Sequence, residues 1–387
     1  MNDSNDPTQT EWMIGMARRA LGAPISEITA TQSRAVHLAP ARSVPRPVRP
    51  KPNLCDTCRM SADDEISRTL VRLLDGYQST QLLYVAAELQ IADALKNGAQ
   101  SSIQLASDVG AQPGSLHRIL RALAALQIVE ELPDGRFALT PSGMLLAADA
   151  PRSQRGAALA RGKLYYAALG ELLPATRDGG TPFELLHGKS FFEHLQEHPD
   201  EAMAFRASMS SRSAREARAI VDSYDFRKFR RLVDVGGGSG VLLRTILAAA
   251  PNLEGLLFDL PSVVAGVELP AAGGNFFDAV PAGSDAYVLS RVIHDWSDDD
   301  AVKILENCRH AMLDDSVLLL AEALLPERAV DNPEAVRMDL HMLTLLHGRE
   351  RTEGEYVQLV SRAGLSHRRT IPTASDVSLI EVKKGEA

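Results

Sequence analysis

The feature that most constrains the fold is a strand–turn–helix–strand pattern within residues 230–264. A short apolar run leads into a turn with glycine at alternate positions, namely Gly236, Gly238 and Gly240. A helical pattern follows, and a second apolar strand ends at Asp259, 19 positions after the last glycine. Such a unit is typical of a parallel sheet with helices on both faces. The sequence therefore predicts an α/β, doubly wound, Rossmann-like sheet.

The same turn carries the first chemical signal. Its glycines let a ligand approach the backbone closely, and the carboxylate of Asp259 can accept hydrogen bonds from both hydroxyls of a ribose. Asp234 lies close to this site in the preceding strand. A dinucleotide fingerprint would need a third glycine where Val241 stands, so a pyrophosphate cofactor is disfavoured. The pattern favours a nucleoside that carries an amino-acid tail.

His294 is the candidate general base. It follows the apolar strand 286–292, at the end of a strand where parallel sheets bind ligands. A histidine with an ordinary pKa of about 6.5 suits this role; the alternative is a loop histidine that is hydrogen-bonded locally. The acidic run 298–300 opens the next helix, and we interpret it as a cap and a partner of the helix dipole rather than a metal site.

Charge and composition divide the chain of 387 residues into three predicted parts. Residues 1–60 are a Pro/Arg-rich tail that we expect to be disordered, because proline removes backbone donors. In that tail Cys55 and Cys58 form an isolated CxxC, which we read as chance spacing. Residues 61–160 and 161–387 are the predicted helical and catalytic domains. Three cysteines and no leader pattern favour the cytoplasm.

Residues 61–150 resemble a winged helix: helical stretches at 82–95 and 102–109, a helical pattern over 113–132, and a hairpin over 133–143 around Asp134–Gly135. This region holds six Lys/Arg and eleven Asp/Glu, and the whole chain has a net charge of −9. Nucleic-acid binding requires positive charge, so we expect an interaction or dimerisation role and no nucleic-acid partner. No apolar run approaches the ~18 residues that span a bilayer, so we expect no membrane partner.

Five segments occur in an order that identifies a resemblance: LVDVGGGSG, FDLPSVV, RVIHDWSDDDAVKILENC, LLLAEALLPE and LHMLTLLHGRERTEGEY. Together they resemble the class I S-adenosylmethionine-dependent O-methyltransferases, in particular the dimeric, metal-independent plant and bacterial enzymes of secondary metabolism. The resemblance implies S-adenosyl-L-methionine as cofactor, no metal, and a homodimer whose winged-helix region is the dimerisation domain. It covers about residues 75–370.

The resemblance also implies roles for individual residues. His294 matches the general base, and Glu322 and Glu353 match two acids that hold its imidazole. The cofactor would be bound by Asp234, Gly236, Gly238, Gly240, Asp259, Asn275, Phe276 and Arg291. The acceptor pocket would be lined by Phe205, Met209, Trp296, Met338 and Met342. From the residues alone, Glu322 could simply end a strand, and Glu353 could complement the dipole of a helix opened by the capping box Thr352-x-x-Glu355.

The segment 260–274 departs from the family pattern. It is short for a helix, a turn and a strand, and it contains several prolines and glycines. We expect its strand to be lost or vestigial. Asn275 stands where the family usually has an acid that contacts the adenine amino group, and its amide carbonyl can still accept that hydrogen bond.

The sequence thus predicts transfer of a methyl group from S-adenosylmethionine to a hydroxyl, expected to be phenolic, on a small hydroxylated secondary metabolite. Two alternatives remain at this point. A family member can use the bound cofactor for hydroxylation or decarboxylation instead, or the short segment 260–274 can leave a binding protein without catalysis. A winged-helix regulator is disfavoured by the negative charge.

Overall fold

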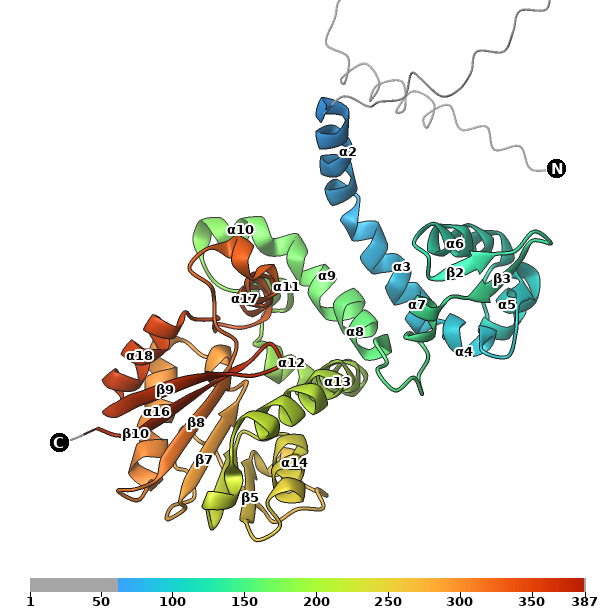
Figure 1. The fold of residues 1–387 in the computed structure, drawn as a ribbon. Helices are drawn as coiled ribbons and strands as arrows, with labels where there is room; N and C mark the ends of the chain where they lie inside the picture. Colours follow the sequence, from blue (N-terminus) through green and yellow to red (C-terminus); the bar gives the residue numbers. More distant parts are fainter. Residues whose placement is uncertain (1–61, 386–387) are drawn as a thin grey trace, which may run out of the picture. The chain divides into compact units, whose positions relative to one another are not determined.

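The computed structural model describes residues 62–385 (Figure 1). The predicted tail 1–60, with Cys55 and Cys58, lies outside the described residues. Within the described part, no helix has the length and apolar character to cross a membrane.

A seven-stranded sheet forms the larger core, in the order β6-β5-β4-β7-β8-β10-β9. Its strands are β4 (Arg231–Val235), β5 (Glu254–Asp259), β6 (Ala271–Gly273), β7 (Ala286–Ser290), β8 (Val317–Glu322), β9 (Leu365–Pro372) and β10 (Ser378–Lys384). The first five strands in the spatial order pair in parallel, and β10 pairs antiparallel with both β8 and β9. Ser290 lies opposite Ala321, so β7 and β8 end side by side. The predicted α/β sheet is confirmed.

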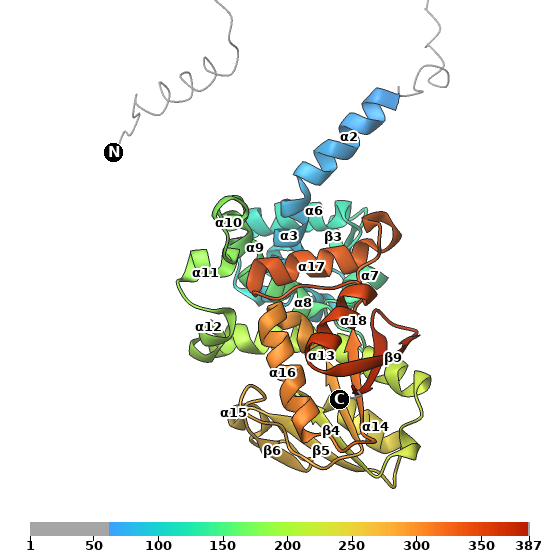
Figure 2. The ribbon, with the colours of Figure 1, turned by 90° about the vertical axis from the view of Figure 1, so that its left-hand side faces the viewer.

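Helices cover both faces of this sheet (Figures 1 and 2). On one face α13 (Pro199–Ser223) and α14 (Val241–Ala249) pack on the strands, with Ile220 and Ile246 fully buried. On the other face lie α16 (Asp298–Ala311) and α18 (Glu353–Arg362), which bury Ile304 and Val360. Full burial of one such aliphatic side chain stabilises the fold by roughly 1.5–3 kcal/mol. The strands are apolar on both faces because both faces are covered.

The short segment after Asp259 keeps a vestige of the expected structure. It forms α15 (Pro261–Val264) and the three-residue edge strand β6, in which Ala271 pairs with Leu257 of β5. Glycine makes the tight packing possible, since a Cβ on Gly274 would lie 2.5 Å from the ring of Phe258. The strand is therefore shortened rather than lost.

The N-terminal region is a winged helix with a three-stranded antiparallel sheet in the order β1-β3-β2. Its elements are α3 (Gly76–Glu88), α4 (Ile91–Leu95), β1 (Gln100–Ser101), α5 (Ser102–Val109), α6 (Pro113–Ala125), β2 (Val129–Glu131) and β3 (Arg136–Leu139). The helix expected over 113–132 ends at Ala125, because Gln127 adopts a left-handed φ of 59° and the chain turns into β2. The hairpin is consequently 129–139, with its turn at Gly135 as expected.

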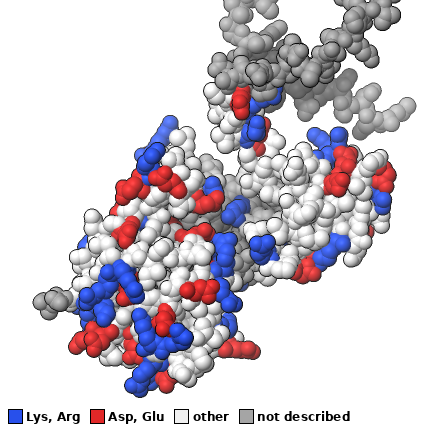
Figure 3. Space-filling model, viewed as in Figure 1, with Lys and Arg blue, Asp and Glu red and all other residues white. Residues whose placement is uncertain are grey.

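The remaining helices precede the sheet or follow β8. They are α2 (Ala62–Leu74), α7 (Pro141–Met144), α8 (Arg155–Ala160), α9 (Tyr166–Ala168), α10 (Leu172–Asp178), α11 (Pro182–His187), α12 (Phe191–Glu197) and α17 (Pro333–Leu345). Gly156 of α8 packs against the backbone of Ala207 in α13, where a larger residue would clash. Figure 3 shows positive and negative side chains interspersed over the visible surface. On the winged helix, Arg121 pairs with Glu131 and Arg136 with Asp134.

Candidate functional site

His294 lies in a tight turn directly after β7. Arg291 follows the strand with a left-handed φ of 57°, and residues Ile293–Asp295 form one 3₁₀ turn. The imidazole of His294 is almost fully buried at the carboxyl end of the sheet. A strained turn of this kind persists only where neighbouring groups hold it in place, so the His294 turn depends on its contacts.

Glu322, the last residue of β8, holds the backbone of this turn. Its Oε1 accepts hydrogen bonds from the backbone N–H groups of Val292 (3.1 Å) and Ile293 (2.9 Å). Its other oxygen has no hydrogen-bond partner among the described residues. The resemblance led us to expect that Glu322 bonds to the imidazole; the structure instead gives it the peptide groups beside His294. Glu322 thereby fixes the backbone from which the side chain of His294 extends.

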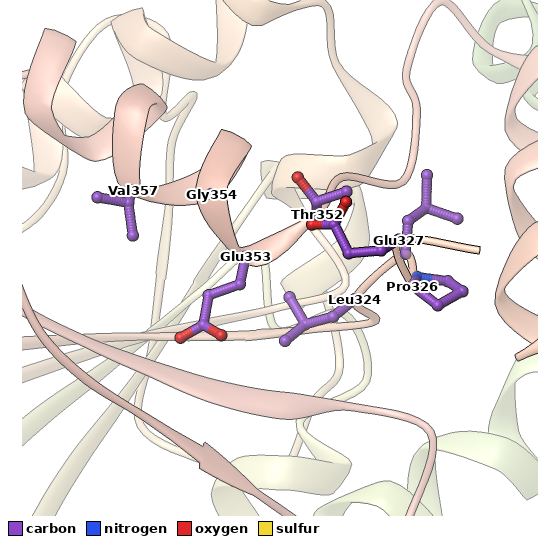
Figure 4. A pocket seen from close by; sticks show the side chains of 8 residues that line it. Leu324, Pro326, Glu327, Thr352, Glu353, Gly354 and Val357 are labelled. Atoms are coloured by element: carbon purple, nitrogen blue, oxygen red, sulfur yellow. The ribbon is translucent and has the colours of Figure 1, made fainter. Parts of the chain in front are cut away.

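The acid that bonds to the imidazole is Glu350. Its Oε1 lies 2.8 Å from Nδ1 of His294, and its side chain is fully buried. The backbone N–H of Glu350 is held in turn by Asp339 of α17, at 2.9 Å. Glu353, which was expected in this role, is exposed on the first turn of α18. Figure 4 shows Glu353 beside Leu324 at the rim of an open surface pocket.

The expectation for Glu353 fails for a local reason. Thr352 caps α18, and Glu355 completes the capping box, so Glu353 occupies the solvent-facing first turn of the helix. Glu350 precedes the cap in the extended segment that crosses over the His294 turn. Gly348 passes so close to the carbonyl oxygen of His294 that any Cβ there would clash.

Arg351 ties the same segment to the turn from the other side. Its fully buried guanidinium donates to the carbonyl oxygens of Ile293 (3.2 Å) and Trp296 (2.9 Å) and pairs with Asp298 at 2.7 Å. The first acid of the run 298–300 is thus an ion-pair partner, and Ser297 caps α16 through the N–H of Asp300. The three acids thus occupy the first turn of α16, as expected for partners of the helix dipole, but the side-chain cap is Ser297 and not one of the acids.

Three carboxylates control the charge of His294. Burial alone would lower its pKa, but Asp295, Glu322 and Glu350 raise the pKa to about 9. Asp295 lies 3.3 Å from Nε2, and burial raises its own pKa. Burial also raises the pKa of Glu322 to about 7. Because the pKa of His294 is higher in the folded than in the unfolded chain, its charge stabilises the fold at low pH, and this contribution is lost as the pH rises through about 9.

His294, Glu322 and Glu350 also present three possible metal ligands, whose donor atoms lie within 4.8 Å of one another. The positive charge of Arg291 already occupies part of this space, with Nη1 3.3 Å from Oε1 of Glu350. The same carboxylate oxygen accepts the hydrogen bond of His294. A divalent ion would have to displace both contacts and would lie beside a guanidinium, which is electrostatically unfavourable.

The glycine turn after β4 is tied to the end of β5. Oδ2 of Asp259 accepts from the N–H of Gly238 (2.8 Å), and Oδ1 accepts from the N–H of Leu260 (2.7 Å). Gly236, Gly238 and Gly240 all have positive φ, between 59° and 75°. A side chain at Gly236 would clash with Val292, just before His294. The glycine turn and His294 therefore lie together at the carboxyl ends of the parallel strands.

Asp234 lies beneath this turn. It is fully buried, burial raises its pKa to about 7, and neither carboxylate oxygen has a hydrogen-bond partner among the described residues. A Cβ at Gly237 would lie 2.5 Å from that carboxylate. An unpaired buried carboxylate under a glycine cradle fits a ligand with positive charge or N–H groups.

The other predicted cofactor residues are placed differently. Asn275 Oδ1 accepts from the N–H of Phe277 at 3.0 Å, and Phe276 lies near the space above Gly236. The guanidinium of Arg291 instead turns to two carboxylates, Glu216 (2.8 Å) and Glu350 (3.3 Å). Its contacts connect α13 with the segment that holds His294.

The five residues expected in the acceptor pocket divide into three groups. Met209 of α13 and Met338 of α17 come together, each with its sulfur within 3.5 Å of the guanidinium of Arg212, and Met342 is buried on α17. Phe205 packs edge-on against Phe191. Trp296 packs against Phe277, with ring centroids 4.7 Å apart, on the side of the glycine turn.

Sequence reasoning missed Glu350, Asp295, Glu216 and Arg212. Glu350 and Asp295 lie inside segments that carried the resemblance, and the capping box already marked Glu353 as a helix residue. Glu216 and Arg212 lie on α13 and reach Arg291 and Met338, 75 and 126 residues further along the chain, and helical periodicity does not reveal such contacts.

Known proteins match this chain in both of its domains. Residues 166–366 match the O-methyltransferase domain, and residues 71–149 match the O-methyltransferase dimerisation domain. The chain is 38% identical to the phenazine O-methyltransferase PhzM of Lysobacter antibioticus over 330 residues, which covers 82% of this chain and 96% of that protein. The crystal structure of LaPhzM superposes with a TM-score of 0.78, at 38% identity, and covers 82% of this chain and 99% of that one.

Not all relatives methylate oxygen. The chain is 35% identical over 299 residues to the 8-amino-8-demethylriboflavin N,N-dimethyltransferase of Streptomyces davaonensis, which covers 73% of this chain and 85% of that protein. The neocarzinostatin O-methyltransferase NcsB1, solved with S-adenosylhomocysteine and a dihydroxynaphthoic acid, matches with a TM-score of 0.70 at 34% identity; the match covers 79% of this chain and 96% of that one.

The contact between Glu350 and His294 generates a direct prediction. In Glu350→Gln the pKa of His294 should fall by roughly 1–3 pH units, because a neighbouring negative charge is removed. The matched variant Glu353→Gln should leave that pKa unchanged. Titration of the imidazole resonance by NMR, assigned by its loss in His294→Ala, measures both. A fall in Glu353→Gln alone would contradict the assignment.

Proposed function

The chain belongs to the O-methyltransferase family, whose enzymes use S-adenosylmethionine, and on this premise we propose that it methylates a phenolic hydroxyl of a secondary metabolite, with His294 as general base. The observation that carries the proposal is the 2.8 Å contact between Nδ1 of His294 and Glu350. This contact fixes the orientation of the imidazole and directs Nε2 away from Glu350, to a position 3.3 Å from Asp295.

The cofactor would be held between β4 and β5. Asp259 at the end of β5 would accept hydrogen bonds from the ribose hydroxyls, the glycines would leave room for the amino-acid tail, and the unpaired carboxyl of Asp234 lies beneath them. Phe276 would lie on the adenine side, with the amide of Asn275 next to it. When bound, S-adenosylmethionine supplies a methyl group already activated by a positively charged sulfur.

The base works through a fixed tautomer. Nδ1–H of His294 donates to Glu350, so Nε2 can accept the proton of the acceptor hydroxyl. A phenol has a pKa of about 10, which is close to the pKa of about 9 for His294, so the proton transfer is nearly balanced. Glu350 then stabilises the imidazolium that forms. The rate should rise with pH up to about 9, because only the neutral imidazole accepts a proton.

We infer that this chemistry requires no metal. Glu350 already contacts both Arg291 and His294, and the methyl donor needs no Lewis acid. The remaining tasks are to align oxygen, carbon and sulfur and to exclude water. The paired methionines Met209 and Met338 supply an apolar surface for an aromatic acceptor.

The relatives favour an aromatic acceptor. Their names state a phenazine, an amino-hydroxybenzoate and a dihydroxynaphthoate as the compounds they methylate. The buried His294–Glu350 pair favours methyl transfer over the two alternatives, a cofactor-dependent hydroxylation or decarboxylation and a binding role without catalysis. The mass of the product distinguishes these alternatives, since a methyl transfer adds one CH₂ unit and a hydroxylation adds one oxygen.

Replacement of the base should abolish turnover selectively. We expect His294→Ala to lower kcat by roughly 10²–10⁴-fold, the usual contribution of a general base, while S-adenosylhomocysteine still binds. The exposed His347, on the same segment, offers the matched control His347→Ala, which should retain the wild-type rate. Methylation is followed by mass spectrometry, and cofactor binding by calorimetry.

An unchanged kcat in His294→Ala would refute the assignment of the base. A wild-type rate that disappears with a chelator and returns with a divalent ion would instead favour the His294–Glu322–Glu350 ligand set.

We also propose a homodimer formed through the N-terminal domain, with domain limits near 61–160 and 161–387. The matched dimerisation domain, 71–149, lies within the first range. Four apolar side chains of α2 that are more than half exposed form one helical stripe, Ile66, Leu70, Leu73 and Leu74. A stripe of this kind is covered by another surface in a stable protein.

Sedimentation should therefore give about twice the chain mass of 41.9 kDa. The double variant Leu70→Glu/Leu73→Glu should shift the protein toward the monomer, because it places charge in the apolar stripe. The control Leu313→Glu changes an exposed leucine outside α2 and should remain dimeric. A monomeric wild-type protein would refute the dimer.

A further inference from the structure

Arg212 is a buried cation with poor partners. Its side chain on α13 is only 19% exposed. The two terminal nitrogens of the guanidinium contact the sulfurs of Met209 (3.4 Å) and Met338 (3.5 Å). A thioether sulfur is a weak acceptor, whereas the guanidinium fork matches the two oxygens of a carboxylate. The terminal N–H donors of this side chain thus face atoms that satisfy them poorly.

The charge of Arg212 is also incompletely balanced within the protein. Its nearest carboxylate is Glu216, 3.8 Å from Nε. That carboxylate makes its short contact, 2.8 Å, with Arg291 instead. Burial and the neighbouring charge of Arg291 both lower the pKa of Arg212, as expected for a cation without a full counter-charge. Burial of such a cation is costly until an anion joins it.

The residues around Arg212 indicate that its guanidinium lies on the acceptor side of the site. Met209 and Met338 are residues that the family resemblance assigns to the acceptor pocket, and they come from two different helices, α13 and α17. Asp295, the neighbour of His294, is near enough for the charge of Arg212 to lower its pKa. The carboxylate of Asp295 lies 3.3 Å from Nε2 of His294, so its negative charge acts on His294 as well as on Arg212.

Two aromatic groups in the same region are close to Arg212. Tyr165 packs edge-on against His341, with ring centroids 4.8 Å apart. Burial, together with the charges of Arg161 and Arg212, lowers the pKa of His341 to about 4, so this imidazole is neutral and adds no competing charge. The region offers flat, uncharged rings beside a guanidinium fork.

We propose that Arg212 binds a carboxylate of the acceptor, so that the enzyme prefers aromatic hydroxy acids over their neutral counterparts. This proposal rests on the proposed function and adds to it the substrate class and the residue that selects it. On binding, the carboxylate replaces the two methionine sulfurs as partner of the fork, and the methionines remain in contact with the ring. The ring is thereby oriented with respect to His294.

The test compares matched acids and amides. Hydroxybenzoate, dihydroxynaphthoate and hydroxyphenazine carboxylate are each titrated into the protein saturated with S-adenosylhomocysteine, beside the corresponding carboxamide. At least one acid should bind at least about 10-fold more tightly than its amide, as expected for a charge-assisted bidentate contact. In Arg212→Met this preference should disappear, and Arg212→Lys should retain only part of it.

Arg215→Met is the matched control, because Arg215 lies one turn away on α13, is exposed and pairs with Asp376. It should keep the acid preference. Binding of S-adenosylhomocysteine, measured first for each variant, shows that the variant is folded. The absence of an acid preference in all three pairs, or a preference that persists in Arg212→Met, would overturn the proposal. Loss of cofactor binding by the wild-type protein would refute the proposed function instead.

Discussion

The site depends on one buried carboxylate at the end of β8. Glu322 accepts hydrogen bonds from two successive peptide groups after β7, and this contact holds the turn that presents His294. It is possible because β7 and β8 are parallel neighbours whose ends coincide, with Ser290 opposite Ala321. The fold thus supplies the geometry, and one acidic side chain converts the end of a strand into a rigid support for His294.

A second layer of contacts comes from the segment before α18. Glu350 fixes the imidazole, Arg351 holds the carbonyls around it, and Gly348 permits the close approach of the two backbones. Arg291 then joins Glu350 to Glu216 on α13. Three parts of the chain that are far apart in sequence therefore meet at one histidine. The negative charges around it raise its pKa, which brings it close to that of a phenol.

The fold could be predicted from the sequence because its signals are local. The glycine turn, Asp259 and the apolar strands each lie within one short segment, and the winged helix follows from periodicity and the turn at Gly135. The position of His294 was equally accessible. The acid that holds its imidazole could not be identified from the sequence. Glu350 and Glu353 lie in the same segment, LHMLTLLHGRERTEGEY, and differ only in that Glu350 precedes α18 whereas Glu353 lies in its first turn. Arg212 and Glu216 were hidden because they reach Met338 and Arg291, which lie on elements far away in the sequence.

We propose that the glycine turn and Asp259 bind the cofactor although the strand β6 has only three residues. Calorimetric titration with S-adenosylhomocysteine tests this most directly, with Asp259→Ala as the comparison. We expect one site per chain with micromolar affinity, weakened at least about 10-fold in Asp259→Ala, since a carboxylate that binds hydroxyls contributes about 1.5–3 kcal/mol. The absence of saturable binding by the wild-type protein at millimolar ligand would contradict it.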